Sequence, residues 1–246
     1  MAGRRLPVLG GLAGLAGPAV FTAAWAVSSL LQTGHAATEV QISGLAAPDA
    51  RDPWIMISGF LVLGCSSVVF GTALDRELGG SGREGRAGRA GRAGPEGRAG
   101  RAGWAGRAGW ADLGPRLIQA AGLLTVAAGL LRRDRMLLTA PAHESWHNHA
   151  HDVVSALIYV ALMAAPLLLA RRFRGDPWWG PLRWPLVSAS LATAAVLVVF
   201  FTGAFPSWAG LLQRIGVSVP LAAVCAVAAR LLAAGGEPQP AGERRR

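Results

Sequence analysis

Residues 153–170 read VVSALIYVALMAAPLLLA, a run without a single charged side chain. A helix needs about 20 predominantly apolar residues to cross the hydrocarbon core of a bilayer, so this run predicts a transmembrane helix. Further runs carry no charge or only isolated arginines, and they occupy residues 6–34, 53–74, 113–131, 185–205 and 211–234. The fold class that follows is an all-α polytopic membrane protein, built as a bundle of six transmembrane helices.

The composition supports a membrane location. Hydrophobic residues make up 52% of the 246 residues and charged residues 15%, whereas soluble domains carry roughly 25% charged residues. All 24 basic residues are arginines, and together with the abundant glycine and alanine this favours a GC-rich coding bias in a bacterial source. The arginines lie between the apolar runs and not on one folded face, so we expect the lipid bilayer as a partner and no nucleic acid.

Glycine recurs at nearly every third position between residues 82 and 109, with arginine and alanine filling most other positions. Collagen has the same glycine period but needs far more proline, so we expect residues 79–112 to form a disordered, cationic, cytoplasmic linker. This linker would separate two transmembrane helices in residues 1–78 from four in residues 113–234. A disordered cytoplasmic tail would follow at residues 235–246.

The first apolar run begins after an arginine pair, as a signal peptide does. It is about twice as long as the apolar region of a signal peptide, so we expect it to remain as a membrane span. Gly10 and Gly14 in this run have the four-residue spacing at which small residues let helices pack closely.

The arginines also predict the orientation of the bundle, because cytoplasmic segments of membrane proteins are enriched in positive charge. If both termini are cytoplasmic, all but five of the 24 arginines fall in cytoplasmic segments. The five on the other side are Arg51, Arg132, Arg133, Arg135 and Arg214. We therefore expect a multi-pass protein of a bacterial plasma membrane, with cytoplasmic termini and linker and an extracytoplasmic histidine cluster.

The histidine cluster lies directly before the run at 153–170 and reads HESWHNHAHD. His143, His147 and His151 are spaced by four, so in a helix beginning near Pro141 they would share one stripe. Histidines at this spacing can share a divalent metal, which makes these three residues a candidate Zn²⁺ or Cu²⁺ site. The alternative is a set of polar residues at the membrane boundary that bind water, headgroups or backbone.

The same segment matches the H-E-x-x-H signature of zinc metalloproteases, in which Glu144 would be the general base. The surroundings fit poorly, because the motif precedes its span and the later spans hold no acidic residue. A haem site is a further alternative, with His35 as the one ligand that could face the cluster from another helix. A metal-dependent membrane hydrolase using this motif is therefore the second functional hypothesis.

Three short segments carry a resemblance. They are residues 38–45 before the second span, His151-Asp152-x-x-Ser155 at the start of the fourth, and residues 210–214, GLLQR, at the start of the last. With these segments the chain resembles the domain-of-unknown-function 998 family of multi-pass bacterial and archaeal membrane proteins, over nearly its whole length apart from the linker and the tail. The resemblance implies a six-span fold and no particular chemistry. It also implies one outer-face site formed by His151, Asp152, Ser155, Gln213 and Arg214.

The first functional hypothesis is a non-enzymatic membrane protein whose extracytoplasmic polar site binds a small ligand, a metal or a partner. This site would add Glu39 and His147 to the family-like residues. Asp152 and Arg214 would form an ion pair at the same membrane face. A second membrane protein and a second copy of the chain are the candidate protein partners.

Overall fold

The computed structural model describes residues 2–34, 36–90, 113–135 and 144–236. Six long helices lie in this part: α1 (Ala2–Leu31), α2 (Pro53–Ala90), α4 (Leu113–Leu130), α5 (Trp146–Arg172), α6 (Arg183–Phe201) and α7 (Ala209–Gly236). Three 3₁₀ turns lie in the connections: η1 (Ile42–Ala46), η3 (Gly180–Leu182) and η4 (Pro206–Trp208). The described residues contain no β-strand, and six helices are long and apolar enough to cross a membrane. The predicted all-α, six-span fold is confirmed.

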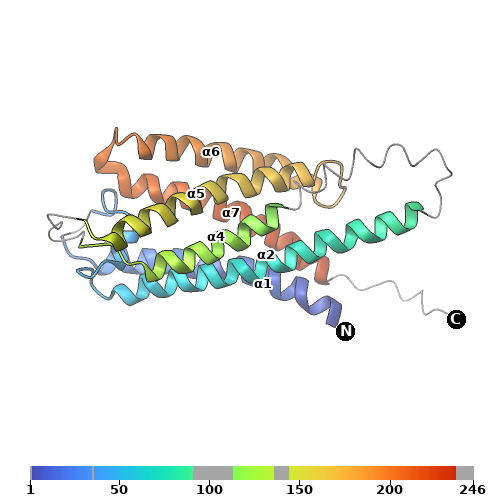
Figure 1. The fold of residues 1–246 in the computed structure, drawn as a ribbon, viewed down its shortest axis with the longest axis horizontal. Helices are drawn as coiled ribbons and strands as arrows, with labels where there is room; N and C mark the ends of the chain where they lie inside the picture. The colour runs from blue at the N-terminus through green and yellow to red at the C-terminus, as the bar shows by residue number, and fades with distance from the viewer. Residues whose placement is uncertain (1, 35, 91–112, 136–143, 237–246) are drawn as a thin grey trace.

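The six helices form a closed ring in chain order (Figure 1). Each helix packs against the next one along the chain, and α7 returns to pack against α1. Sequential helices commonly become spatial neighbours when the connections between them are short. The ring leaves an interior lined by several helices, and the candidate site lies there.

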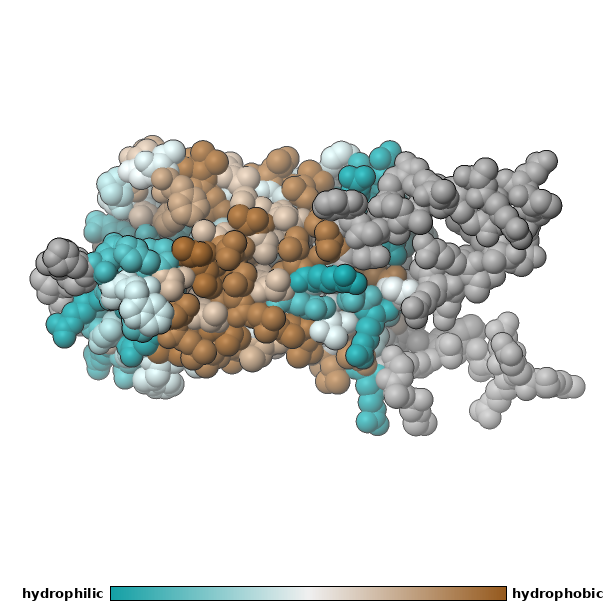
Figure 2. All heavy atoms as spheres, in the orientation of Figure 1, coloured by the Kyte–Doolittle hydropathy of each residue, from teal (hydrophilic) through white to brown (hydrophobic). Residues whose placement is uncertain are grey.

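The two ends of the ring differ. The described parts of three connections, residues 32–34 and 36–52, 131–135 and 144–145, and 202–208, lie at one end, which we call the His151 end. At the opposite end, which we call the linker end, α1 begins, α7 ends and α2 projects past the other helices (Figure 1). On the face shown in Figure 2, apolar residues cover the middle of the bundle and hydrophilic residues lie toward both ends, as expected for a bundle that crosses a bilayer.

Glycines set the spacing of several helix pairs. On α1, Gly10 faces α2 and Gly14 faces both α2 and α7, which confirms the close packing predicted from their spacing. Between α2 and α4, a Cβ on either Gly64 or Gly122 would lie 2.6 Å from the carbonyl oxygen of the other. Helices in a membrane commonly pack with their backbones this close. Apolar side chains gain little free energy by moving from lipid into a helix interface, so van der Waals contact between closely packed helices holds them together.

One boundary differs clearly from the prediction. α2 continues to Ala90, so residues 79–90, which we predicted as part of a disordered linker, are helical. Alanine and arginine favour helix. The next proline after Pro53 is Pro95, so no proline stops the helix at the point where its apolar run ends. Residues 91–112 and 237–246, which hold the rest of the predicted linker and nearly all of the tail, lie outside the described residues.

The connection between α1 and α2 carries part of the core. All five residues of η1 are buried, and Ile42 and Leu45 pack with Phe21 of α1 and with Met56 and Phe60 of α2. This connection was predicted only as a loop. It packs into the His151 end of the ring and places backbone groups beside the start of α7.

Candidate functional site

The start of α5 is fixed by a capping interaction. Ser145 is the N-cap, and its hydroxyl accepts a hydrogen bond from the backbone N–H of Asn148 at 3.3 Å. The backbone N–H of Ser145 in turn donates to the Asp134 carboxylate at 2.7 Å. This hydrogen bond from Ser145 lowers the pKa of Asp134, because it stabilises the ionised carboxylate. The contact therefore persists at neutral pH and weakens only when Asp134 takes up a proton in acid.

The prediction of a three-histidine helical stripe is wrong. α5 begins at Trp146, so His143 lies ahead of the helix, in residues 136–143 outside the described part. The other two histidines differ in exposure: the ring of His147 is exposed and stacks on Trp146 at 3.8 Å, whereas His151 is buried. Among the described residues, no three His, Cys, Asp or Glu side chains are grouped closely enough to hold one metal ion. The Zn²⁺ or Cu²⁺ site stays a prediction.

The described residues give no geometric support to the hydrolase and haem hypotheses. Glu144, the candidate general base, is exposed, and its carboxylate lies 3.4 Å from Nδ1 of His149. His143 of the motif and His35, the candidate haem ligand, both lie outside the described residues. Both hypotheses stay predictions.

His151 is buried, with 3% of its surface exposed, and its ring orientation is fixed by α4. Its Nδ1 lies 2.7 Å from the carbonyl oxygen of Leu131 and 3.1 Å from that of Ala128. Both partners can only accept, so Nδ1 carries a hydrogen and donates. In the neutral ring, Nε2 then presents a lone pair as an acceptor.

The ring of His151 lines a cavity inside the helix ring. The cavity holds about 650 Å³ of empty space, its mouth included, and most of its wall is apolar. The lining residues belong to α1, η1, α2, α4, α5 and α7 and include no Asp, Glu, Lys or Arg from the described part of the chain. Its polar lining residues are Ser43, Ser67, Thr125, His151, Ser155, Tyr159 and Gln213.

Four of these polar residues form one cluster at the His151 end. His151, Ser155 and Tyr159 are spaced by four on α5 and therefore share a helix face. Gln213 enters from α7, and its Oε1 accepts a hydrogen bond from the backbone N–H of Ile42 at 2.5 Å. That bond fixes the orientation of the amide and leaves its NH₂ group as a donor. Tyr159 and Gln213 line the same cavity.

Arg214, next to Gln213 on α7, acts as a clamp on the α1–α2 connection. Its guanidinium donates to the carbonyl oxygens of Ala37 at 2.6 Å and Val40 at 2.9 Å, and to the Ser29 hydroxyl at 3.0 Å. The charged group also lies over the ring of Trp25, 5.4 Å from its centroid. Arg214 is 6% exposed and does not line the cavity, so its role in the described structure is to hold the connection against α7.

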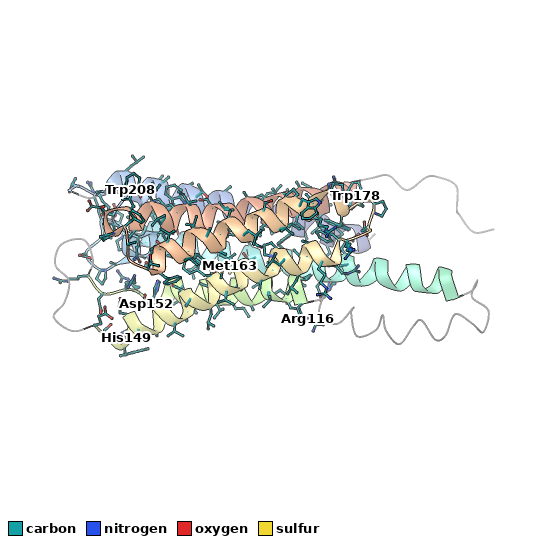
Figure 3. The ribbon with its side chains drawn as sticks, turned by 90° about the horizontal axis from the view of Figure 1, so that it is seen from above. Arg116, His149, Asp152, Met163, Trp178 and Trp208 are labelled. Carbon is teal, nitrogen blue, oxygen red and sulfur yellow. The ribbon has the colours of Figure 1, made fainter. Side chains whose placement is uncertain are left out.

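The predicted ion pair between Asp152 and Arg214 is wrong. Asp152 instead forms an ion pair with Arg133, with 3.0 Å between the carboxylate and the guanidinium. Arg133 also donates to the Asn148 side chain at 3.1 Å and to the Gln41 side chain at 2.8 Å. Asp152 lies at the polar end of the bundle, on the same side as Trp208 (Figure 3). Arg133, which precedes α5, lies closer to Asp152 than Arg214 of α7 does. The spacing of these residues in the sequence could not predict that difference.

The Arg133 network gives a prediction about stability. Arg133→Met should lower the unfolding free energy by about 1–2 kcal/mol, because it removes hydrogen bonds to three side chains from a largely buried arginine. Asp152→Asn should cost less than about 1 kcal/mol, because its carboxylate is half exposed. Thermal unfolding of the detergent-purified variants measures both. If the two substitutions lowered the unfolding free energy equally, the contribution of Arg133 would be limited to its ion pair with Asp152, and its hydrogen bonds to Asn148 and Gln41 would contribute nothing.

The structure brings only some of the predicted binding residues together. His151, Ser155 and Gln213 line one cavity, whereas Asp152 and Arg214 make structural contacts beside it. Glu39 is exposed and is not among the cavity-lining residues. Three of the predicted binding residues therefore line one cavity, and the outer-face site itself stays a prediction.

Tyr159 is one of the polar cavity residues that sequence reasoning missed, together with Ser43, Ser67 and Thr125. It is the single tyrosine of the chain, and it lies eight residues after His151, on the same helix face. That spacing within an otherwise apolar run was a usable signal. The contribution of Ser43, by contrast, depends on how η1 folds into the bundle, which no periodicity indicates.

Comparison with known proteins gives one match. A family model described as "Protein of unknown function (DUF998)" matches residues 15–94 and 98–230. No curated protein and no solved structure matches the chain.

Proposed function

Because the chain belongs to the DUF998 family, whose function is unknown, we propose its function from the cavity at the His151 end. The protein binds a small, uncharged molecule that carries a hydroxyl or a similar hydrogen-bonding group, and it performs no chemistry on that molecule. The observation that carries the proposal is the cluster of His151, Ser155, Tyr159 and Gln213 on the wall of a largely apolar cavity. Apolar pockets with a few convergent polar groups are the usual form of small-molecule sites.

The hydrogen-bonding groups of the cluster complement a hydroxyl. Nε2 of His151 is available as an acceptor, since Nδ1 is occupied by two carbonyls. The amide NH₂ of Gln213 is available as a donor, since Oε1 is occupied by the N–H of Ile42. A ligand hydroxyl can donate to the first and accept from the second, which a purely apolar molecule cannot do.

The composition of the wall supports an uncharged ligand. A buried ion needs an opposite charge or several hydrogen bonds to offset its desolvation. The described residues that line the cavity supply no carboxylate, guanidinium or ammonium group. Beside the cavity, Arg133 is paired with Asp152, and Arg214 donates its hydrogen bonds to the α1–α2 connection and to Ser29.

The arginine distribution supports an extracytoplasmic site in this proposal. Arg5, Arg76, Arg116, Arg171 and Arg174 are all exposed at or near the linker end. An excess of arginine marks the cytoplasmic side of bacterial membrane proteins. The His151 end therefore faces outward in a bacterial plasma membrane, and the ligand reaches the cavity from that side or from the bilayer.

Photolabelling tests this function. The probe is an octanol that carries a diazirine, applied to the detergent-purified protein, with the labelled residues identified by mass spectrometry. We expect labels on the cavity wall near Ser155 and Tyr159, and an at least tenfold reduction in the His151→Leu variant because the hydroxyl loses its acceptor.

The control is His147→Leu, which changes an exposed histidine on the same helix and should leave the labelling unchanged. Metal content is measured in parallel on protein without a histidine tag. Labelling that is indifferent to His151 would refute the proposed site. Stoichiometric zinc or copper that His151→Leu removes would replace the ligand site with a metal site.

A further inference from the structure

A second cavity continues the first one toward the linker end. It has about 490 Å³ of empty space, its openings included, and is lined by α2, α4, α5, α6 and α7. Its wall is apolar except for Ser67, whose hydroxyl donates to the carbonyl oxygen of Leu63 on its own helix. The side chains of this wall therefore offer no free donor, and Ser67 alone offers a hydroxyl acceptor.

The two cavities are adjacent. Four residues line both of them: Ser67, Ala121, Leu162 and Leu221. Along α5, the outer cavity is lined from His151 to Leu162 and the inner cavity from Ala161 to Leu169. Met163, near the middle of the bundle in Figure 3, lies in the stretch of α5 where the two cavities meet. The interior of the ring is thus polar at one end and apolar along the rest.

The length of this interior can be compared with a lipid chain. From His151 to Leu169 the axis of α5 rises roughly 27 Å, at 1.5 Å per residue. A lipid chain spans about half of the roughly 30 Å hydrocarbon core of a bilayer. The stretch of α5 that lines the two cavities is therefore at least as long as one extended hydrocarbon chain. The phosphate of a phospholipid would meet no basic residue on the described wall.

We propose that the ligand of this protein is a single-chain lipid with an uncharged hydroxyl head, such as a long-chain alcohol. The hydroxyl lies between His151 and Gln213, and the chain extends through the ring past Ala121 and Leu162 into the inner cavity. This inference rests on the proposed function and adds the class of ligand to it. Burial of the chain supplies affinity, and the polar cluster fixes which end of the ligand lies at the His151 end.

Two photoreactive forms of hexadecanol test the position of the chain. One carries a diazirine at the end of the chain and the other carries it next to the hydroxyl. In the detergent-purified wild-type protein, we expect the terminal probe to label the inner cavity, at Phe70, Ile118 or Val227. The probe next to the hydroxyl should label Ser155 or Tyr159. Terminal labels confined to lipid-facing residues such as Val160 and Leu191 would overturn the inference.

A cavity-filling variant tests the same point independently. Ala165 lines the inner cavity and is 4% exposed, so Ala165→Phe should reduce hexadecanol labelling at least tenfold while octanol still labels the outer cavity. Ala156→Phe is the matched control, because Ala156 is exposed on the same helix and should leave both probes unaffected. If Ala165→Phe does not fold, the labelling pattern of the wild-type protein still decides.

The outcomes separate this inference from the proposed function. Loss of octanol labelling in His151→Leu together with no hexadecanol in the inner cavity would retain the outer site and refute the chain. Failure of both probes to label the cavity would refute both proposals. Competition with palmitate tests the head: displacement of the hexadecanol probe by palmitate more strongly than by hexadecanol would refute an uncharged head.

Discussion

Arg214→Met is expected to lower the unfolding free energy by about 3 kcal/mol, the largest loss for any single polar side chain at the His151 end. The guanidinium of Arg214 donates to two carbonyls of the α1–α2 connection and to the hydroxyl of Ser29, all within 3.0 Å. Methionine keeps most of the apolar contact but donates nothing, so these part-buried acceptors lose their charged partner. Thermal unfolding of detergent-purified protein, followed by tryptophan fluorescence, measures the loss.

The control is Arg51→Met, in the same connection. Arg51 is exposed, and its guanidinium lies 4.0 Å from the carboxylate of Asp52, so its removal should change the unfolding free energy by less than about 1 kcal/mol. Arg214→Lys should fall between the two, because an ammonium group donates to fewer of the acceptors at once. Equal losses for Arg214→Met and Arg51→Met would refute the clamp.

The clamp gives a physical account of two of the segments that resemble the family. Residues 210–214 and residues 38–45 lie against each other: the backbone N–H of Leu211 donates to the carbonyl oxygen of Thr38 at 3.0 Å. A Cβ at Gly210 would lie 2.7 Å from the carbonyl oxygen of Ala37, so a side chain there would push the connection away. These segments hold the connection at the His151 end and thereby position Gln213 at the cavity.

The fold could be predicted from the sequence because membrane helices are specified by long apolar runs. The run at 113–131 corresponds to α4 within one residue, since both ends of the apolar run coincide with helix ends. The start of α5 could not be predicted in the same way, because Ser145 and the Asp134 carboxylate, not hydropathy, determine where the helix begins. The order of the helices around the ring likewise depends on how the helices pack against one another, which hydropathy does not specify.

The site was only partly predictable for the same reason. His151, Ser155 and Gln213 were named from the sequence, and the cavity wall includes all three. The predicted ion-pair partner of Asp152 was wrong, because a charged side chain at a helix end pairs with the opposite charge that is nearest in space, which is Arg133. Polarity identified candidate residues, but burial decided which of them face the interior and which hold the connections.

Gly122→Leu is expected to cost at least about 3 kcal/mol, because the new side chain would meet backbone and not flexible atoms. A Cβ at Gly122 would lie 2.6 Å from the carbonyl oxygen of Gly64, so α2 and α4 must move apart. Their separation would also disturb the cavity, whose wall includes Ser67 of α2 and Thr125 of α4. Both the unfolding temperature and the octanol labelling should therefore fall together.

The matched control for Gly122→Leu is Gly79→Leu on α2. A Cβ at Gly79 would meet no atom within 4 Å, so this substitution should leave stability unchanged or raise it slightly through better helix propensity. Comparison of the two variants by thermal unfolding in detergent separates the effect of close packing from the effect of adding a leucine. A Gly122→Leu variant as stable as Gly79→Leu would mean that the α2–α4 contact does not set the spacing of the ring. In that case the cavity would have to be held open by the clamp at Arg214 and by the connections, and the loss in Arg214→Met should then extend to octanol labelling as well.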